Sequence, residues 1–489
     1  MSPWLKRAPG APFVAMTPGE RAGIVGLLVI IAAATLPFAL TAGDASRLIL
    51  YLAFFAYLCV LALPFLLRQW TPSIFHPLVF YVIWVGVQGL LRGSMVLPVT
   101  GLDYHRTLSG PAAGDLDLLV ATSFLLEAVA ILSLYAGYVM APRFRVRQFA
   151  VPKPQWLALK SAFWVGIAGL GLFALATIGG GLDQVLMQRG IASDQRIAAQ
   201  VGGHWGYLAG IGVVAPLVWL ACDRRAVRSP LFWGVVLVAL AIKFASTGSR
   251  GGTIGPLIMI GAIYVLQHRV VPYRAVLVGV LVSLVLIGGL GQYRHATMQA
   301  KTFDQISVEG GPLGWMSTAV EEMQLGAGEN SGQLAVLGRV PQDVSHLWGE
   351  SYLSIPFIFI PSAVWGEKPD AAGKLTAARI YGNPLNAIPP GPVGEAYWNF
   401  SYPGVVMVFL FYGVLLKLVA GVYQANPGHP LVLIAFIYIL FIMKPHSPSV
   451  YGFFHALVPA LVIFASFVLR LNGEIRFWRS AGAVHKGRV

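Results

Sequence analysis

Long apolar runs separated by short polar stretches recur along the whole chain. Twelve of them can be marked, at about residues 23–42, 47–67, 76–91, 118–141, 160–179, 205–222, 231–246, 253–267, 274–291, 404–420, 430–443 and 450–470. Runs of roughly 17–25 apolar residues are typical of helices that cross a lipid bilayer. The pattern therefore predicts an all-α polytopic membrane protein with about 12 transmembrane helices. The first run is one of many and follows a polar, proline-containing stretch, so we interpret it as a span and not as a cleaved signal peptide.

The composition agrees with this interpretation. The 489 residues are 57% hydrophobic and 11% charged, whereas soluble domains carry about 25% charged residues. The net charge of +14 is spread over the polar stretches. A charge bias between the two membrane faces explains it better than a nucleic-acid ligand does, so we expect no nucleic-acid partner.

The basic residues also orient the chain. If the N-terminus lies inside, the inner loops and the C-terminal tail hold 20 basic residues against three acidic ones. The other 14 basic residues then share the outer side and the membrane with 17 acidic ones. Cytoplasmic loops of membrane proteins carry an excess of Lys and Arg. Both termini are therefore predicted to be cytoplasmic.

One polar segment is much longer than the others. We divide the chain into residues 1–292 (spans 1–9 with short loops), 293–403 (a large outer loop) and 404–489 (spans 10–12 and a basic tail). Long loops in compact folds are usually functional. Within this loop we expect helices at Thr318–Leu337 and Ala371–Ile380. Its semi-apolar stretch Ile355–Val364 is too short and too broken to span, and we interpret it as a re-entrant or interfacial piece.

A small cationic turn separates the seventh and eighth runs. It reads STGSRGGTIG, residues 246–255. The glycines allow backbone N–H groups to approach an anion, and the guanidinium of Arg250 stays charged and binds phosphate bidentately. Arg250, with Ser249 and Gly251, is therefore a candidate site for a diphosphate. The alternative is that Arg250 is an ordinary cation near a span end, with its head at the membrane surface.

Two further stretches carry candidate chemistry at the outer surface. The ninth run ends in GQYRHATMQAK (291–301), where Arg294 places a cation beside a possible base, His295; both could equally be interfacial anchors. The long loop ends in PPGPVGEAYWNFSYPGV (389–405), where Glu395 could deprotonate an acceptor hydroxyl and Trp398 could stack on a sugar ring. The alternative for Glu395 is a helix N-terminal acid that faces the helix dipole.

Metal chemistry has little support in the sequence. The ten histidines and the two cysteines, Cys59 and Cys222, do not have the spacing of a metal site or suggest a bridge. Asp115 and Asp117 form an isolated D-x-D, which fits a helix N-terminal acid pair better than a metal site. We expect no metal and no cofactor. Glu127 lies inside the fourth run, where a carboxylate needs an Arg or Lys partner, with Lys243 one candidate, or a proton.

Three of these motifs occur in a recognisable order. The turn before the eighth run contains TGSRG. The outer loop contains ESYLSIPFIFIPSAVWGEKPDAAGKL (350–375), and its exit reads PGPVGEAYWNFSYPGVVMVFLFYGVLL (390–416). In these motifs, and in the large loop before the third-last run, the chain resembles the oligosaccharide repeat-unit (Wzy-type) polymerases of the O-antigen polymerase and ligase superfamily. It departs from them at Tyr402-Pro403, where the family has a glycine-rich link.

The resemblance implies a membrane glycosyltransferase that polymerises polyprenyl-diphosphate-linked oligosaccharide repeat units into O-antigen, capsular polysaccharide or exopolysaccharide. Its site would face the periplasm at the bacterial inner membrane. Its partners would be undecaprenyl-diphosphate-linked oligosaccharide and membrane lipids, with a chain-length regulator and a flippase as candidate accessory proteins. Arg250 then corresponds to the motif arginine near the diphosphate, and Glu395 and Asn399 to the G-E and N-F positions. Ligase members use a loop histidine in catalysis, for which His295 and His346 are candidates here.

Other functions remain open. An O-antigen ligase would have the same fold and donor but would transfer the glycan to a lipid A-core acceptor. A metal-dependent lipid-sugar glycosyltransferase would use Asp115 and Asp117, which lie in the second outer loop, whereas such enzymes place their acids in the first. A transporter or flippase would suit twelve spans, but the long loop and the lack of a visible internal repeat disfavour it.

Overall fold

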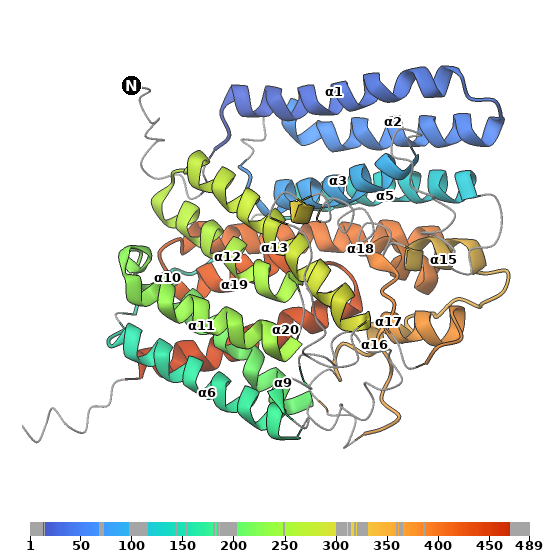
Figure 1. Ribbon diagram of the computed structural model, residues 1–489. Helices are drawn as coiled ribbons and strands as arrows, with labels where there is room; N and C mark the ends of the chain where they lie inside the picture. Colours follow the sequence, from blue (N-terminus) through green and yellow to red (C-terminus); the bar gives the residue numbers. More distant parts are fainter. Residues whose placement is uncertain are drawn as a thin grey trace, which may run out of the picture.

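The computed structural model describes most of the apolar runs and part of the long polar segment. The described residues are 13, 15–67, 73–96, 116–142, 144–152, 154–178, 181, 182, 185, 203–247, 250–299, 311, 314–316, 319, 331–357, 360, 365–384 and 387–469. These residues are helical throughout (Figure 1), apart from connections and one isolated bridge between Ala15 and Ser73.

Each predicted run coincides with a helix or a pair of helices. The first half of the chain contains α1 (Pro18–Leu40), α2 (Ala45–Leu66), α3 (Pro77–Val96), α5 (Leu116–Met140), α6 (Leu157–Ile178), α9 (Gly203–Gly210), the 3-10 turn η3 (Ile211–Val213) and α10 (Val214–Cys222). The second half contains η4 (Ala226–Arg228), α11 (Pro230–Thr247), α12 (Arg250–His268), α13 (Tyr273–Gln299), α15 (Ser331–Arg339), α16 (Glu350–Leu353), α17 (Ala372–Leu375), the π-helical turn η7 (Thr376–Ile380), α18 (Gly391–Ala425), α19 (Pro430–Phe441) and α20 (Ser447–Val468).

The helices have the length and composition of membrane spans. Among the described residues, eight helices are long and apolar enough to cross a bilayer, and four apolar helices are shorter. In α1 and α13, only 17% and 11% of the most apolar window is buried inside the protein. Apolar side chains exposed along a whole helix are expected where the helix faces lipid. The described part of the chain is therefore all-helical and has the character of a multi-pass membrane protein.

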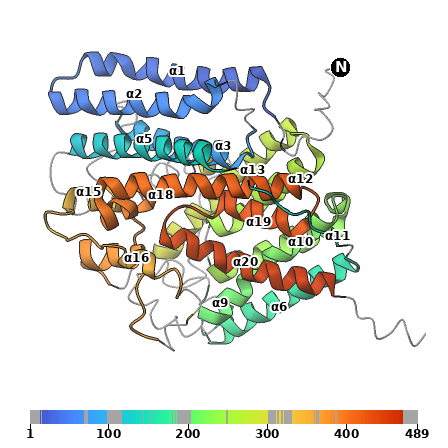
Figure 2. The ribbon, with the colours of Figure 1, turned by 180° about the vertical axis from the view of Figure 1, so that it is seen from behind.

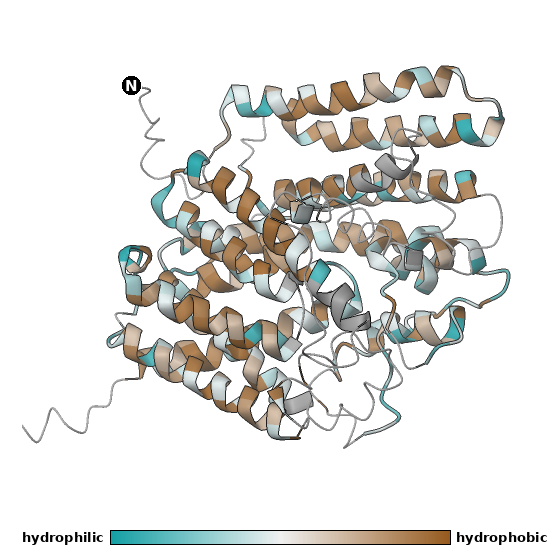
Figure 3. Ribbon diagram, in the orientation of Figure 1, coloured by the Kyte–Doolittle hydropathy of each residue, from teal (hydrophilic) through white to brown (hydrophobic). Residues whose placement is uncertain are grey.

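The helices lie roughly side by side in layers. The hairpin of α1 and α2 forms one edge, α3 and α5 follow, and α18 lies beneath them, while α6 and α9 form the opposite edge (Figure 1 and Figure 2). One hydrophobic core joins α2, α3, α5, α15 and α18, and a second joins α6, α10, α11, α12, α19 and α20. Apolar residues line the helices and hydrophilic ones gather toward their ends and connections (Figure 3). Because α18 contributes to both cores, with Leu416 in the first and Tyr423 in the second, it is the central helix.

Two glycines let α5 and α18 approach each other closely. A Cβ atom at Gly137 would collide with the backbone carbonyl of Leu410, and one at Gly413 would collide with that of Leu134. Small residues at such crossings are typical of helix packing in membranes, where van der Waals contact supplies much of the stability. This contact fixes α18, and therefore the residues on it, against the first core.

The described part of the long segment collects at one end of the bundle. There lie α15, α16, α17 and η7, whereas α1 begins and α20 ends at the opposite end (Figure 1 and Figure 2). The predicted helix Ala371–Ile380 is confirmed as α17 and η7. Of the predicted helix Thr318–Leu337, α15 covers the C-terminal part. Most of the stretch Ile355–Val364 lies outside the described residues.

Candidate functional site

The helix α18 is broken near its start. Phe400 (φ −140°, ψ 23°) and Ser401 (φ 56°, ψ −152°) leave the helical conformation. Pro403 has no N–H, so the carbonyl of Asn399 cannot receive its usual helical donor four residues later. The break therefore falls at Phe400 and Ser401, directly before Tyr402-Pro403, and it frees backbone carbonyls at the end of a short first helical section, residues 391–399.

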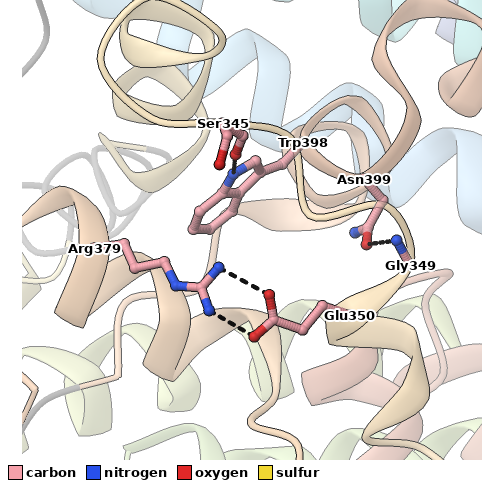
Figure 4. A network of polar contacts seen from close by, with 6 residues as sticks. All are labelled: Ser345, Gly349, Glu350, Arg379, Trp398 and Asn399. Atoms are coloured by element: carbon pink, nitrogen blue, oxygen red, sulfur yellow. Dashed lines mark hydrogen bonds and ion pairs between the residues drawn. The ribbon is translucent and has the colours of Figure 1, made fainter.

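Loop 345–349 donates backbone hydrogen bonds to these carbonyls. The N–H of Leu347 donates to Trp398 O at 3.0 Å, and the N–H of Trp348 donates to Asn399 O at 3.2 Å. The N–H of Gly349 donates to Asn399 Oδ1 at 2.9 Å (Figure 4). Gly349 has φ +95°, a backbone conformation that favours glycine. The loop is thus held on α18 by backbone donors that replace the missing helical ones.

Glu395 lies one turn before the break and is completely buried. Its Oε1 accepts from the hydroxyl of Ser351 at 2.7 Å, and its Oε2 accepts from the N–H of Ser447 at 2.9 Å. The side-chain amide of Asn399 donates to Ser351 Oγ at 2.8 Å and to Glu395 O at 2.8 Å. These four residues, Ser351, Glu395, Asn399 and Ser447, are called the kink site below. They join α16, α18 and α20, and Ser447 Oγ also accepts from the N–H of Ala372 in α17 at 3.1 Å.

His346 lies on the surface side of the kink site. Its Nδ1 lies 3.1 Å from the carbonyl oxygen of Trp398. A carbonyl oxygen only accepts, so Nδ1 carries a proton, and in the neutral form of the ring the lone pair is at Nε2. Trp398 itself is fully buried and its Nε1 donates to Ser345 O at 3.1 Å (Figure 4). The loop therefore presents a ring nitrogen that can accept a proton.

A half-exposed ion pair joins the turn η7 to the start of α16. Arg379, on the π-helical turn η7, donates from both terminal nitrogens to the carboxylate of Glu350, at 2.8 and 2.6 Å (Figure 4). The two side chains are 43% and 38% exposed. A half-exposed pair adds little stability, but its two-point geometry fixes η7 relative to the start of α16.

The connection between α19 and α20 brings a buried cation close to Ser447 in the sequence. Lys444 is 7% exposed, and its Nζ lies over the rings of Tyr81 at 5.4 Å and Trp84 at 5.1 Å. It donates to Leu440 O at 3.3 Å. Burial lowers the pKa of Lys444 to about 7. Burial also lowers the pKa of His446 to about 4, and the charge of Lys444 adds to this effect.

Two shielded polar atoms beside the kink site have spare hydrogen-bonding capacity. Within the described part of the chain, Tyr352 Oη and His446 Nδ1 have no hydrogen-bond partner. They belong to the residues next to Ser351 and Ser447 in the sequence. Burial raises the pKa of Tyr352 well above its ordinary value, and the neighbouring Glu395 adds to the shift. Buried polar atoms normally find partners, so these two can serve a polar ligand or water.

The structure brings together four of the predicted site residues. His346, Glu395, Trp398 and Asn399 meet at the broken section of α18. Arg250 and Gly251 begin α12, and Arg294 and His295 lie in the last turns of α13. For these four residues the structure describes the backbone but not the side chains. Ser249 and Asp115 lie outside the described residues, and Asp117 lies in the first turn of α5.

Sequence reasoning missed the partners that complete the kink site. Ser351 and Ser447 were not candidates, because a serine and a backbone N–H carry no signal of their own. Lys444 had a usable signal, since a charged residue between two closely spaced apolar runs is a functional hypothesis in membrane proteins. Glu127 accepts from the side-chain amide of Gln333 of α15 at 3.2 Å, whereas the sequence predicted a basic partner such as Lys243.

The residues described offer no obvious metal centre. No group of three or more His, Cys, Asp and Glu within the described ranges is arranged to hold a metal ion, and both cysteines are free. Comparisons of the chain with protein-family models, with curated proteins and with solved structures found no match.

Proposed function

We propose that the protein is a membrane glycosyltransferase that polymerises polyprenyl-diphosphate-linked oligosaccharide repeat units at the outer face of the bacterial inner membrane. One observation carries the proposal. The two stretches that resemble the polymerases, 350–375 and 390–416, fold against each other around a fully buried carboxylate, Glu395. This polar unit lies at one end of an apolar bundle (Figure 1), where a lipid-anchored donor and a polar acceptor can meet.

In the proposed reaction, an acceptor hydroxyl of one repeat unit attacks the anomeric carbon of the chain carried by another. The new glycosidic bond forms as the bond from that carbon to the diphosphate oxygen breaks. The hydroxyl proton passes to Nε2 of His346, and polyprenyl diphosphate leaves. Arg250 stabilises the charge that grows on the departing diphosphate.

The geometry favours His346 over Glu395 as the base. Both carboxylate oxygens of Glu395 are already engaged by Ser351 and Ser447, and its side chain is 0% exposed. His346 is half-buried, and its tautomer is set by the carbonyl of Trp398. Glu395 then acts as a positioning residue, which holds α16 and α20 against the section of α18 that orients His346.

The test uses purified protein in nanodiscs supplied with lipid-linked repeat units. We expect chain growth by the wild type and a loss on the order of 100- to 10,000-fold in turnover for His346→Ala, the range typical of general-base removal. His268→Gln is the matched control, because His268 Nδ1 also bonds a backbone carbonyl, Tyr264 O at 3.0 Å, but at the far end of α12.

Each alternative has its own outcome in this assay. Transfer to lipid A-core with no chain growth would make the protein a ligase. Movement of intact lipid-linked units across the bilayer, with no new glycosidic bond, would make it a transporter. Normal chain growth by His346→Ala would remove His346 from the mechanism.

A further inference from the structure

Trp348, in the loop beside the kink site, has an exposed side chain and a strained backbone. Trp348 is 74% exposed, and its φ of 48° is one that a residue with a side chain rarely adopts. The three N–H groups of Leu347, Trp348 and Gly349 fix this conformation on the end of the first section of α18. Strain of this kind persists only where surrounding contacts impose it, and it concentrates at functional sites.

The indole begins a row of rings. The Trp348 and His346 centroids lie 5.6 Å apart, those of His346 and Tyr397 lie 6.0 Å apart, and those of Tyr397 and Tyr402 lie 5.3 Å apart. Each pair meets edge to face. The inner ring, Tyr397, is buried, whereas Tyr402 is 56% exposed. The row therefore exposes a large aromatic surface at each end, on either side of His346.

We propose that Trp348 and Tyr402 form a binding surface for a pyranose ring of the acceptor glycan, which they hold over Nε2 of His346. The proposal rests on the proposed function and adds the subsite for one of its two substrates. The C–H face of a sugar ring is attracted by the negative face of an aromatic ring, and its hydroxyls need polar neighbours. His346 supplies such a neighbour between the two exposed rings.

A membrane-surface anchor is the competing interpretation, since Trp and Tyr also collect at headgroup depth. Strain alone does not decide between them, because the exposed Trp156 also has a positive φ. One observation favours the sugar: the row of rings that begins at Trp348 includes a histidine whose Nδ1 is bonded to a backbone carbonyl, so that its Nε2 can accept a hydroxyl proton. Rigid aromatic rings on a fixed backbone are instead the usual way in which a protein prepares a contact surface for a ligand.

The experiment separates acceptor binding from donor binding. The probe is the repeat-unit oligosaccharide released from its carrier by mild acid, which has lost the diphosphate and can therefore act only as an acceptor. Lipid-linked repeat units whose acceptor hydroxyl is chemically blocked are the donor, so they cannot also serve as acceptors. Initial rates are measured while each substrate is varied in turn, for protein in nanodiscs.

For Trp348→Leu we expect the acceptor KM to rise roughly 3- to 10-fold, the range of one aromatic contact. The donor KM and kcat should change little, and Trp348→Phe should recover most of the loss. Trp156→Leu is the control. Trp156 is 73% exposed and has φ 60°, but it precedes α6 at the opposite end of the bundle (Figure 1).

Every outcome decides one of the two proposals. An unchanged acceptor KM in an active Trp348→Leu variant overturns the sugar surface and leaves the polymerase intact. An unchanged KM with less protein in the membrane identifies an anchor and also overturns it. If Trp348→Leu does not fold, Tyr402→Leu carries the same expected rise in KM, and its failure to show that rise is equally decisive. Absence of chain growth by the wild type refutes the proposed function instead.

Discussion

Ser351→Ala is the sharpest test of how the kink site is held together. The change removes the hydroxyl that donates to Glu395 Oε1 at 2.7 Å and accepts from Asn399 Nδ2 at 2.8 Å. Oε1 then loses the donor described for it inside a fully buried site, whereas Nδ2 keeps its bond to Glu395 O. An unmet buried polar group costs about 1–3 kcal/mol, and the weakened amide adds about 1 kcal/mol. We expect a loss of about 2–4 kcal/mol in the free energy of unfolding.

The measurement is a reversible SDS titration of purified protein in mixed micelles, followed by tryptophan fluorescence. Ser354→Ala is the matched control. Ser354 lies three residues further along, and among the described residues its hydroxyl donates to the nearby Ser351 O, at 2.6 Å. A local bond at a half-buried position is worth about 1 kcal/mol or less. If Ser351→Ala is no more destabilising than Ser354→Ala, the kink site does not hold the segment as argued.

Two other predictions address the cations. Arg250→Ala should reduce turnover on the order of 100- to 1,000-fold. Arg250→Lys should remain clearly impaired, because lysine keeps the charge but lacks the planar guanidinium that binds phosphate at two points. Near-normal polymerisation by both variants, at matched protein levels, would show that Arg250 does not bind the diphosphate. Burial lowers the pKa of Lys444 from 10.5 to about 7, so between these values the unfolded chain binds more protons and stability rises with pH. Between about pH 7 and about pH 9.5 the melting temperature should rise more for the wild type than for Lys444→Met. Equal rises in the two proteins would contradict the lowered pKa of Lys444.

The sequence predicted the helices well because their signal is long and simple. Each of the twelve apolar runs coincides with a helix, although α9 and α10 share one run through the turn η3. The starts were less accurate. For α18 the apolar run begins at residue 404, whereas the helix begins at Gly391. Its first section is polar and buried by protein rather than lipid, and hydropathy cannot distinguish that environment from a loop.

The candidate site was predicted in part for a similar reason. Glu395 and Asn399 stand four residues apart and share one face of a helix, a spacing that sequence can show. Their partners come from α16 and α20, at separations of 44 and 52 residues for Ser351 and Ser447. Such contacts depend on how the segments pack. The exposure of Trp348 depends on a backbone conformation that its residue type disfavours, so no local pattern could indicate it.

The location of the site follows from the backbone of α18. In an apolar bundle, every backbone polar group must be satisfied inside the protein, so a helix can break only where other residues supply the missing hydrogen bonds. Pro403 removes one donor, and loop 345–349 replaces it with the N–H of Trp348. Because His346 and Trp348 belong to loop 345–349, binding of this loop to the end of the first section of α18 also brings the imidazole and the indole to that end. The break in α18 is therefore what brings a histidine and an exposed tryptophan close to a buried carboxylate.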